Sequence, residues 1–230
     1  MKGAVLVIGS LLWEDENNSL NKFQGKLRSD WRKSLDIKNK IQLRVPIRYG
    51  RKSSSKRCTY TMIFSNSQVK LGTAFLIPFH KVSLDFVDIK KQALELSIAE
   101  GISIRKYPNR LIASWGAVGI ALNNNSENDL GVIRKCWEKE FESFKNGGYQ
   151  IGEEIPSIKE NGELNFEFKI PEGIDYVFAT PVKPNISEYP SADKVVEAIL
   201  ESSPRYDTYV KENYHNGIRT EGDIEIVECL

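Results

Sequence analysis

Histidine and cysteine are scarce in this chain of 230 residues, and each scarcity excludes a kind of site. The two histidines, His80 and His215, offer little material for a histidine-rich metal site or a charge-relay triad. The three cysteines, Cys58, Cys136 and Cys229, lie far apart and form no CxxC pair, which argues against a disulfide framework and a zinc site. We therefore expect no metal ion and a reducing, cytoplasmic location.

Long apolar runs are missing as well. The run at residues 4–8 is too short for a signal peptide, and no run approaches the roughly 18 residues that cross a bilayer. We therefore expect no membrane partner. Apolar residues make up 40% of the chain and charged residues 27%, which are ordinary values for a globular protein. The length predicts one domain over residues 1–230, with a core of about residues 1–145 and a C-terminal extension of about residues 146–230.

Several familiar catalytic motifs are also absent. The chain contains no GxxxxGK[ST], GxGxxG, GxSxG or HExxH pattern. The sequence therefore contains no motif that supports a phosphate-binding loop, a dinucleotide site, a serine hydrolase or a zinc protease. We expect no cofactor.

Apolar patterning predicts a sheet that begins at the N-terminus. Residues 4–8 form a continuous β-branched run, as expected of a central strand buried on both faces, and Gly9-Ser10 ends it. Residues 41–49 alternate with period two, and Pro46 requires an edge strand or a bulge because proline cannot donate to a ladder. Residues 59–65 complete a hairpin with this strand. Further strands are expected at residues 72–77, 111–122, 164–170 and 176–180.

Helices are expected in four places. The first begins at Ser83 and ends before Gly101, with an apolar face that includes Leu84, Val87, Leu94 and Ile98. The second carries an apolar and aromatic stripe typical of a core, made of Leu130, Ile133, Trp137, Phe141 and Phe144. Ser191 caps the third, and the last runs from Pro204 through Val210. Because the early strands lie too close in sequence for crossover helices, we predict an α+β fold with a mixed or largely antiparallel sheet.

Positive charge is concentrated in one stretch, although the net charge is only +1. Residues 22–57 contain thirteen Lys or Arg side chains and only two acids, Asp30 and Asp36. Such a block attracts anionic ligands or nucleic acid. It also suits the solvated face of edge strands, where cations prevent edge-to-edge pairing. Both interpretations stay open.

The turn after the first strand is the leading candidate for a site. Glycine allows unusual backbone angles and a close ligand approach, so the amides of the Gly9-Ser10 loop can converge on a carboxylate or an oxyanion. The alternative is a plain turn. Trp13 follows this loop and is a candidate pocket wall, whereas Trp115 and Trp137 are expected in the core. Residues 14–19 are expected to form an exposed loop.

Three segments resemble the γ-glutamylcyclotransferase-like family: Val5 to Leu11, Thr59 to Phe64, and Gly72 to Ile77. Members of that family carry a Tyr-Gly-Ser-Leu loop after the first strand. Gly9, Ser10 and Leu11 match this loop, and Ile8 replaces the tyrosine. The resemblance covers about residues 2–122. It implies a β-barrel-like sheet with flanking helices, to which residues 146–230 add an α/β extension.

The resemblance also implies a reaction. In that family the α-amine of a γ-glutamyl group attacks its own γ-amide carbonyl, which releases an amine and 5-oxoproline. Glu100, which precedes Gly101, is the implied proton shuttle, and a position at a helix C-terminus raises the pKa of a carboxyl group. The alternative is an exposed glutamate in a last helical turn. We expect Ile8, Gly9, Ser10 and Leu11 to bind the substrate, with Arg48 and Arg51 as candidates to hold its carboxylate.

Two functions stay open. The first is this enzyme, acting on a small γ-glutamyl or other anionic ligand derived from an amino acid. The second is a non-catalytic binding module of the same fold, which uses residues 22–57 to bind an acidic ligand, a protein partner or nucleic acid. That stretch contains few aromatic platforms for base stacking, namely Phe23, Trp31 and Tyr49, so nucleic acid is not the expected partner. The sequence does not define the oligomeric state.

Overall fold

The computed structural model describes residues 1–53, 59–66, 70–126, 128, 130–202 and 206–230. They form an α+β fold around a five-stranded sheet with the order β2-β5-β1-β7-β6. The strands are β1 (Gly3–Val7), β2 (Ile41–Val45), β5 (Gly72–Pro78), β6 (Gly119–Leu122) and β7 (Tyr176–Ala179). β1 pairs parallel with β7, and the other neighbours are antiparallel, so the sheet is mixed as predicted.

The central position of β1 confirms the prediction from its apolar run. All five of its residues are buried, between β5 on one side and β7 on the other. β5 is also buried along its whole length and ends at Pro78 as expected. The chain leaves β1 at Val7 and turns through a short 3-10 helix, η1 (Ser10–Leu12).

Pro46 marks the point where the chain passes from one sheet to another. β2 is an edge strand of the large sheet, whereas β3 (Ile47–Lys52) pairs with β4 (Tyr60–Phe64) in a separate two-stranded sheet. The predicted hairpin therefore exists as β3 and β4. The expected barrel-like closure is wrong for the described residues, because the ladder is interrupted at Pro46 and the strands form two separate sheets.

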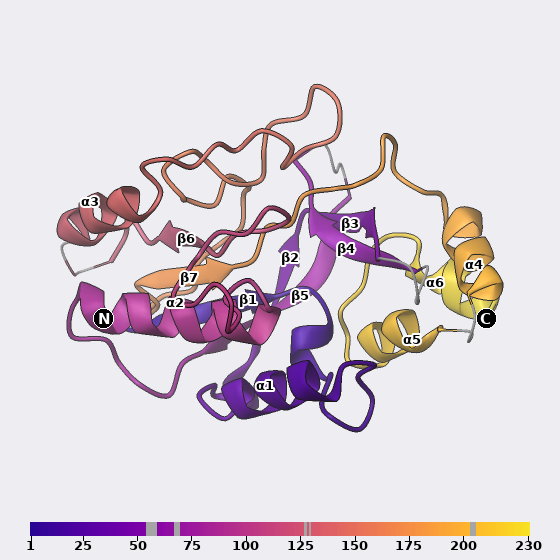
Figure 1. The fold of residues 1–230 in the computed structure, drawn as a ribbon, viewed down its shortest axis with the longest axis horizontal. Helices are drawn as coiled ribbons and strands as arrows, with labels where there is room; N and C mark the ends of the chain where they lie inside the picture. Colours follow the sequence, from indigo (N-terminus) through magenta and orange to yellow (C-terminus); the bar gives the residue numbers. More distant parts are fainter. Residues whose placement is uncertain (54–58, 67–69, 127, 129, 203–205) are drawn as a thin grey trace.

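Two helices lie against each other beside the large sheet: α1 (Lys22–Arg32) and α2 (Phe86–Glu100) (Figure 1). α2 ends as predicted, with Gly101 in the left-handed conformation at φ 82°. It begins later than predicted, because Asp85 is the N-cap, while the buried Ser83 hydroxyl lies 2.7 Å from that of Tyr176. Leu84 and Val87 are 83% and 73% exposed, so their predicted burial is wrong.

The middle of the chain contains less regular structure than its pattern suggests. Only Gly119–Leu122 of the predicted strand at 111–122 forms a strand, and residues 164–170 form none. Phe166 is instead buried by stacking on Phe64, with 4.2 Å between ring centroids. The predicted core stripe is buried at Ile133, Trp137, Phe141 and Phe144, but α3 (Gly131–Glu140) ends before Phe141, so the helix is shorter than predicted.

The C-terminal region adds β7 to the sheet and three helices near the C-terminus (Figure 1). These are α4 (Ala192–Glu201), α5 (Thr208–His215) and α6 (Asp223–Glu228). Ser191 caps α4 as predicted, and Pro204 lies outside the described residues. No helix in the described ranges has the length and apolar character needed to cross a membrane.

Candidate active site

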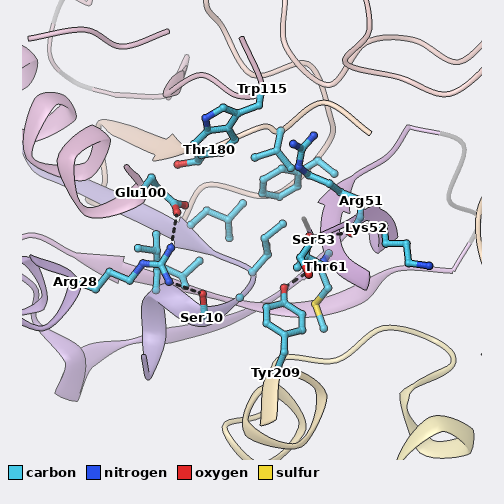
Figure 2. Close-up of a pocket in the computed structure, with 18 of the residues that line it drawn as sticks. Ser10, Arg28, Arg51, Lys52, Ser53, Thr61, Glu100, Trp115, Thr180 and Tyr209 are labelled. Carbon is cyan, nitrogen blue, oxygen red and sulfur yellow. Dashed lines mark hydrogen bonds and ion pairs between the residues drawn. The ribbon is translucent and has the colours of Figure 1, made fainter. Parts of the chain in front are cut away.

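A cavity of about 530 Å³ lies where β1 ends (Figure 2). The turn at Ile8 to Leu11 forms one wall, and β3 and β4 form another. Arg28 of α1, Glu100 at the end of α2 and Tyr209 of α5 complete it, together with loop residues Trp115, Thr180, Val182 and Asn185. Segments that lie far apart in the sequence therefore meet at one site.

Arg28 connects the Gly9-Ser10 loop to Glu100 (Figure 2). Its Nη1 donates to the Ser10 hydroxyl at 3.0 Å, and its Nη2 lies 3.8 Å from Glu100 Oε2. Its Nε donates to the carbonyl of Ala99 at 3.2 Å. The guanidinium is thus fixed between the loop and the last turn of α2.

Glu14 also holds Arg28, although residues 14–19 were expected to be exposed. The Glu14 carboxylate pairs with Arg28 Nη1, and Glu14 is only 1% exposed. Arg32, one helical turn later, donates to the carbonyls of Leu11 and Glu14 at 2.8 Å each. The sequence contains a signal for this arrangement, because Gln24, Arg28 and Arg32 recur at intervals of four and share one face of α1. The Gln24 amide donates to the carbonyls of Ile98 and Ala99.

Glu100 lies at the wall of the cavity, and its side chain is 19% exposed. Burial raises the pKa of its carboxyl group, whereas the Arg28 charge and the Thr180 hydroxyl oppose that rise. The raised pKa agrees with the direction expected from the sequence, but burial is its principal cause. The Thr180 hydroxyl itself is buried and makes no hydrogen bond of ordinary geometry with the described residues.

Arg51 gives the opposite wall a positive charge. Its Nη1 donates to the carbonyl of Lys183 at 2.5 Å, and within the described residues no carboxylate pairs with it. Burial lowers the pKa of this guanidinium, which nevertheless stays charged in proteins. A partly buried cation without a counter-charge favours an anionic ligand.

The structure brings together six of the seven residues predicted for the site. Ile8, Gly9, Ser10, Leu11, Arg51 and Glu100 all line the cavity. Arg48 does not, because its guanidinium stacks on the Tyr189 ring, 3.5 Å from the centroid. Arg48 lines a different pocket, beside Pro190 and Thr220, and the register of β3 shifts between Tyr49 and Arg51.

Two of the three tryptophans considered in the sequence, Trp13 and Trp115, are placed differently from the expectation. Trp115 lines the cavity and is only partly buried, so its predicted core position is wrong. Trp13 lies outside the cavity lining and donates from Nε1 to Asn213 Oδ1 at 2.8 Å. Trp137 lies in the core as predicted.

Gly9 has an extended backbone, with φ −169° and ψ −148°, which other residues also adopt. A Cβ at this position would lie 2.8 Å from the Tyr209 hydroxyl oxygen, closer than real Cβ atoms approach. Close packing of Tyr209, rather than unusual backbone angles, therefore explains the glycine. Sequence reasoning missed Tyr209, because nothing in the pattern of α5 links it to the first strand.

The basic stretch at 22–57 is divided by the fold. Arg28, Arg32 and Arg51 turn toward the cavity or the loop beside it. Lys26 and Lys33 pair with Asp30 on the exposed side of α1. Residues 54–57 lie outside the described residues. The positive side chains of this stretch therefore make separate local contacts instead of one continuous basic surface in the described residues.

Among the described residues, no group of three or more His, Cys, Asp or Glu side chains has an arrangement that suits a metal ion. Comparisons of the chain with protein-family models, with curated proteins and with solved structures each return no match.

Proposed function

We propose that this chain is a γ-glutamyl cyclotransferase-like enzyme, which releases 5-oxoproline and an amine from a γ-glutamyl amide. One observation carries the proposal: the Glu100 carboxyl group and the Gly9-Ser10 loop face the same cavity and are joined through Arg28. The proposal accords with the resemblance of residues 2–122 to the γ-glutamylcyclotransferase-like family.

The reaction needs a folded substrate and one group that moves a proton. The substrate α-amine attacks the γ-carbonyl carbon, so a C–N bond forms and the carbonyl oxygen becomes an oxyanion. Glu100 takes a proton from the attacking nitrogen and returns it to the leaving nitrogen as the original amide bond breaks. No co-reactant is required, because both nitrogens and the carbonyl belong to the substrate.

The cavity offers groups for each charged part of that substrate. Arg51 is suited to bind the α-carboxylate, since a guanidinium makes two parallel hydrogen bonds to a carboxylate. Within the described residues the N–H groups of Ser10 and Leu11 have no hydrogen-bond acceptor, so they are available to an oxyanion. Arg28 keeps Glu100 ionised enough to accept a proton, while burial keeps the carboxyl group basic enough to hold it.

A screen for 5-oxoproline release from γ-glutamyl amines and γ-glutamyl dipeptides tests the proposal. With a substrate in hand, Glu100→Gln is expected to lower kcat by about 10²–10⁴, because the amide cannot transfer the proton. Glu95→Gln is the matched control on the same helix, since Glu95 does not line the cavity. Both variants should retain a cooperative thermal transition.

Two results would overturn this function or its assignment. If no γ-glutamyl compound yields 5-oxoproline, the chain is not such an enzyme. If Glu100→Gln turns the substrate over at the wild-type rate, another group carries the proton.

Arg51 has no carboxylate partner among the residues that the structure describes, which supports the second candidate, a binding module for an anionic ligand derived from an amino acid. Ile8, which replaces the family tyrosine, also suits a site that binds without catalysis. Calorimetric binding of a γ-glutamyl compound without release of 5-oxoproline would support this alternative. We do not propose nucleic acid as the ligand, because the basic stretch is divided among local contacts.

A further inference from the structure

The Tyr209 hydroxyl is a polar group of the cavity that the reaction above does not use. Tyr209 is 6% exposed, and α5 carries it to the wall of the cavity (Figure 2). A Cβ added at Gly9 would lie 2.8 Å from the Tyr209 oxygen. The Met62 N–H donates to this oxygen at 3.1 Å. The ring is held at the same time by an edge contact with Trp13, with 6.5 Å between centroids.

The hydrogen-bonding groups around Tyr209 leave its own proton without a protein acceptor. Met62 N–H is a donor, and the neighbouring Asn213 side chain offers its amide nitrogen, because its oxygen already accepts from Trp13. That amide nitrogen is buried and makes no hydrogen bond of ordinary geometry. No residue in the described ranges accepts the phenol proton, so its free direction is the cavity.

The hydroxyl is also a stable donor. Burial raises the pKa of Tyr209, while the Met62 and Asn213 donors oppose this rise in part. The phenol therefore stays protonated throughout the physiological pH range. A buried donor without a protein acceptor is costly to the fold, and a water molecule, an ion or a catalytic role accounts for such groups in native proteins.

We propose that Tyr209 is a catalytic residue, whose hydroxyl donates a hydrogen bond to the γ-carbonyl oxygen as it becomes an oxyanion. This inference rests on the cyclotransferase function proposed above. No proton is transferred in this step, since the phenol only stabilises the developing charge. The C-terminal region thereby supplies part of the active site.

Gly9 provides an independent observation for this placement. An added Cβ would lie 2.8 Å from the Tyr209 oxygen but 3.7 Å from the nearest ring carbons, which is ordinary contact. The glycine therefore leaves space for the hydroxyl group alone. In a Tyr209→Phe variant the hydroxyl is absent, so alanine fits at position 9.

Tyr209→Phe tests the catalytic role, because it keeps the ring and removes the donor. We expect kcat for 5-oxoproline release to fall by about 10²–10³, as for other lost oxyanion donors, while KM changes little. Tyr49→Phe is the matched control, since it removes a buried hydroxyl that donates to Asp223 outside the cavity. It should lower the thermal midpoint without the fall in kcat.

The outcomes separate this inference from the function on which it rests. A wild-type protein that releases no 5-oxoproline from any γ-glutamyl compound overturns both. An active wild type with a Tyr209→Phe variant of equal kcat overturns the role of Tyr209 alone. The role of Tyr209 is also overturned if Tyr49→Phe lowers kcat as much as Tyr209→Phe does.

A thermal double-mutant cycle tests the position of the hydroxyl without any substrate. We expect Gly9→Ala to lower the thermal midpoint of the wild type, because its Cβ meets the hydroxyl. In the Tyr209→Phe background the same substitution should cost less than half as much, since contacting residues do not act additively. An equal loss in both backgrounds would show that the hydroxyl does not occupy this space and would overturn the inference.

Discussion

Arg28 shows how much of the site depends on one side chain. Its guanidinium contacts the Ser10 hydroxyl, the Glu14 carboxylate, the Ala99 carbonyl and the Glu100 carboxylate. Two carboxylates therefore share one cation, and Glu100 is the more distant of the two. The Arg28 charge lowers the pKa of Glu100 against the larger effect of burial.

At the residue scale, we predict that Arg28→Gln shifts the pH dependence of kcat/KM. Loss of the cation removes a cause that lowers the pKa of Glu100, so this pKa rises further. The base form of Glu100 is then lost at a higher pH as the solution is acidified. We expect the acid limb of the kcat/KM profile to move to higher pH, measured with whichever γ-glutamyl substrate the screen provides.

Lys26→Gln is the matched control, because it removes one exposed positive charge from the same helix. Its acid limb should stay at the wild-type position. A shift of the Arg28→Gln limb toward lower pH, or no shift, would contradict the proposed coupling.

At this scale the sequence predicted the residues near the turn and missed those that come from elsewhere. Gly9, Ser10 and Glu100 have local signals, namely the end of an apolar run and the end of a helix. Arg28 and Tyr209 reach the cavity, and Glu14 reaches Arg28, only through tertiary packing. The spacing of Gln24, Arg28 and Arg32 places them on one face of α1, but it does not say what that face contacts. Trp115 was assigned to the core because a tryptophan in an apolar stretch is usually buried.

At the scale of elements, Asp223 connects α6 to β3 through a hydrogen bond with Tyr49. Its carboxylate accepts from the Tyr49 hydroxyl at 2.7 Å and from the Thr220 N–H at 2.6 Å. Both Asp223 and Tyr49 are buried. We expect Asp223→Ala to reduce the free energy of unfolding by about 1–3 kcal/mol, because it leaves buried donors without an acceptor.

Urea unfolding measures this change, with Glu225→Ala as the control from the exposed side of the same helix. Glu225→Ala should alter the free energy of unfolding by less than about 0.5 kcal/mol. Equal effects of the two substitutions would mean that the Asp223 contact does not hold α6 in place.

Elements were predictable where burial followed chain periodicity. β1 and β5 are predictable because a continuous run of mostly apolar residues is typical of a strand buried on both faces. The stripe that begins in α3 is predictable because its apolar residues repeat at helical spacing. The segment at 164–170 alternates equally well, yet Phe166 is buried by packing against the rings of Phe64 and the partly buried Phe168 instead of in a ladder. The start of α2 was misplaced because Ser83 bonds to Tyr176, a contact across 93 residues.

At the scale of the molecule, β7 joins the C-terminal region to the N-terminal strand. It lies between β1 and β6, and the pairs Gly3 with Tyr176 and Val5 with Phe178 set its register. A chain that ends at residue 145 would leave one side of β1 without its partner. We expect this fragment to show no cooperative thermal transition by circular dichroism, because its buried strand loses hydrogen bonds and apolar contacts.

Addition of a separate chain of residues 146–230 is the control, and it should restore the transition. A fragment of residues 1–145 that unfolds cooperatively on its own would contradict this prediction.

Pro46 has a mechanical consequence for the site. The cavity has one wall at the end of β1 in the large sheet and another on β3 and β4 in the small sheet. Any rotation between the sheets would change the width of the cavity, and the chain connects β2 to β3 through Pro46 alone. The ring of proline fixes φ near −65°, and the carbonyl of Pro46 accepts from Ser65 N–H at 2.9 Å. The proline ring therefore removes one backbone rotation between β2 and β3, and the Ser65 hydrogen bond ties the end of β4 to the same point.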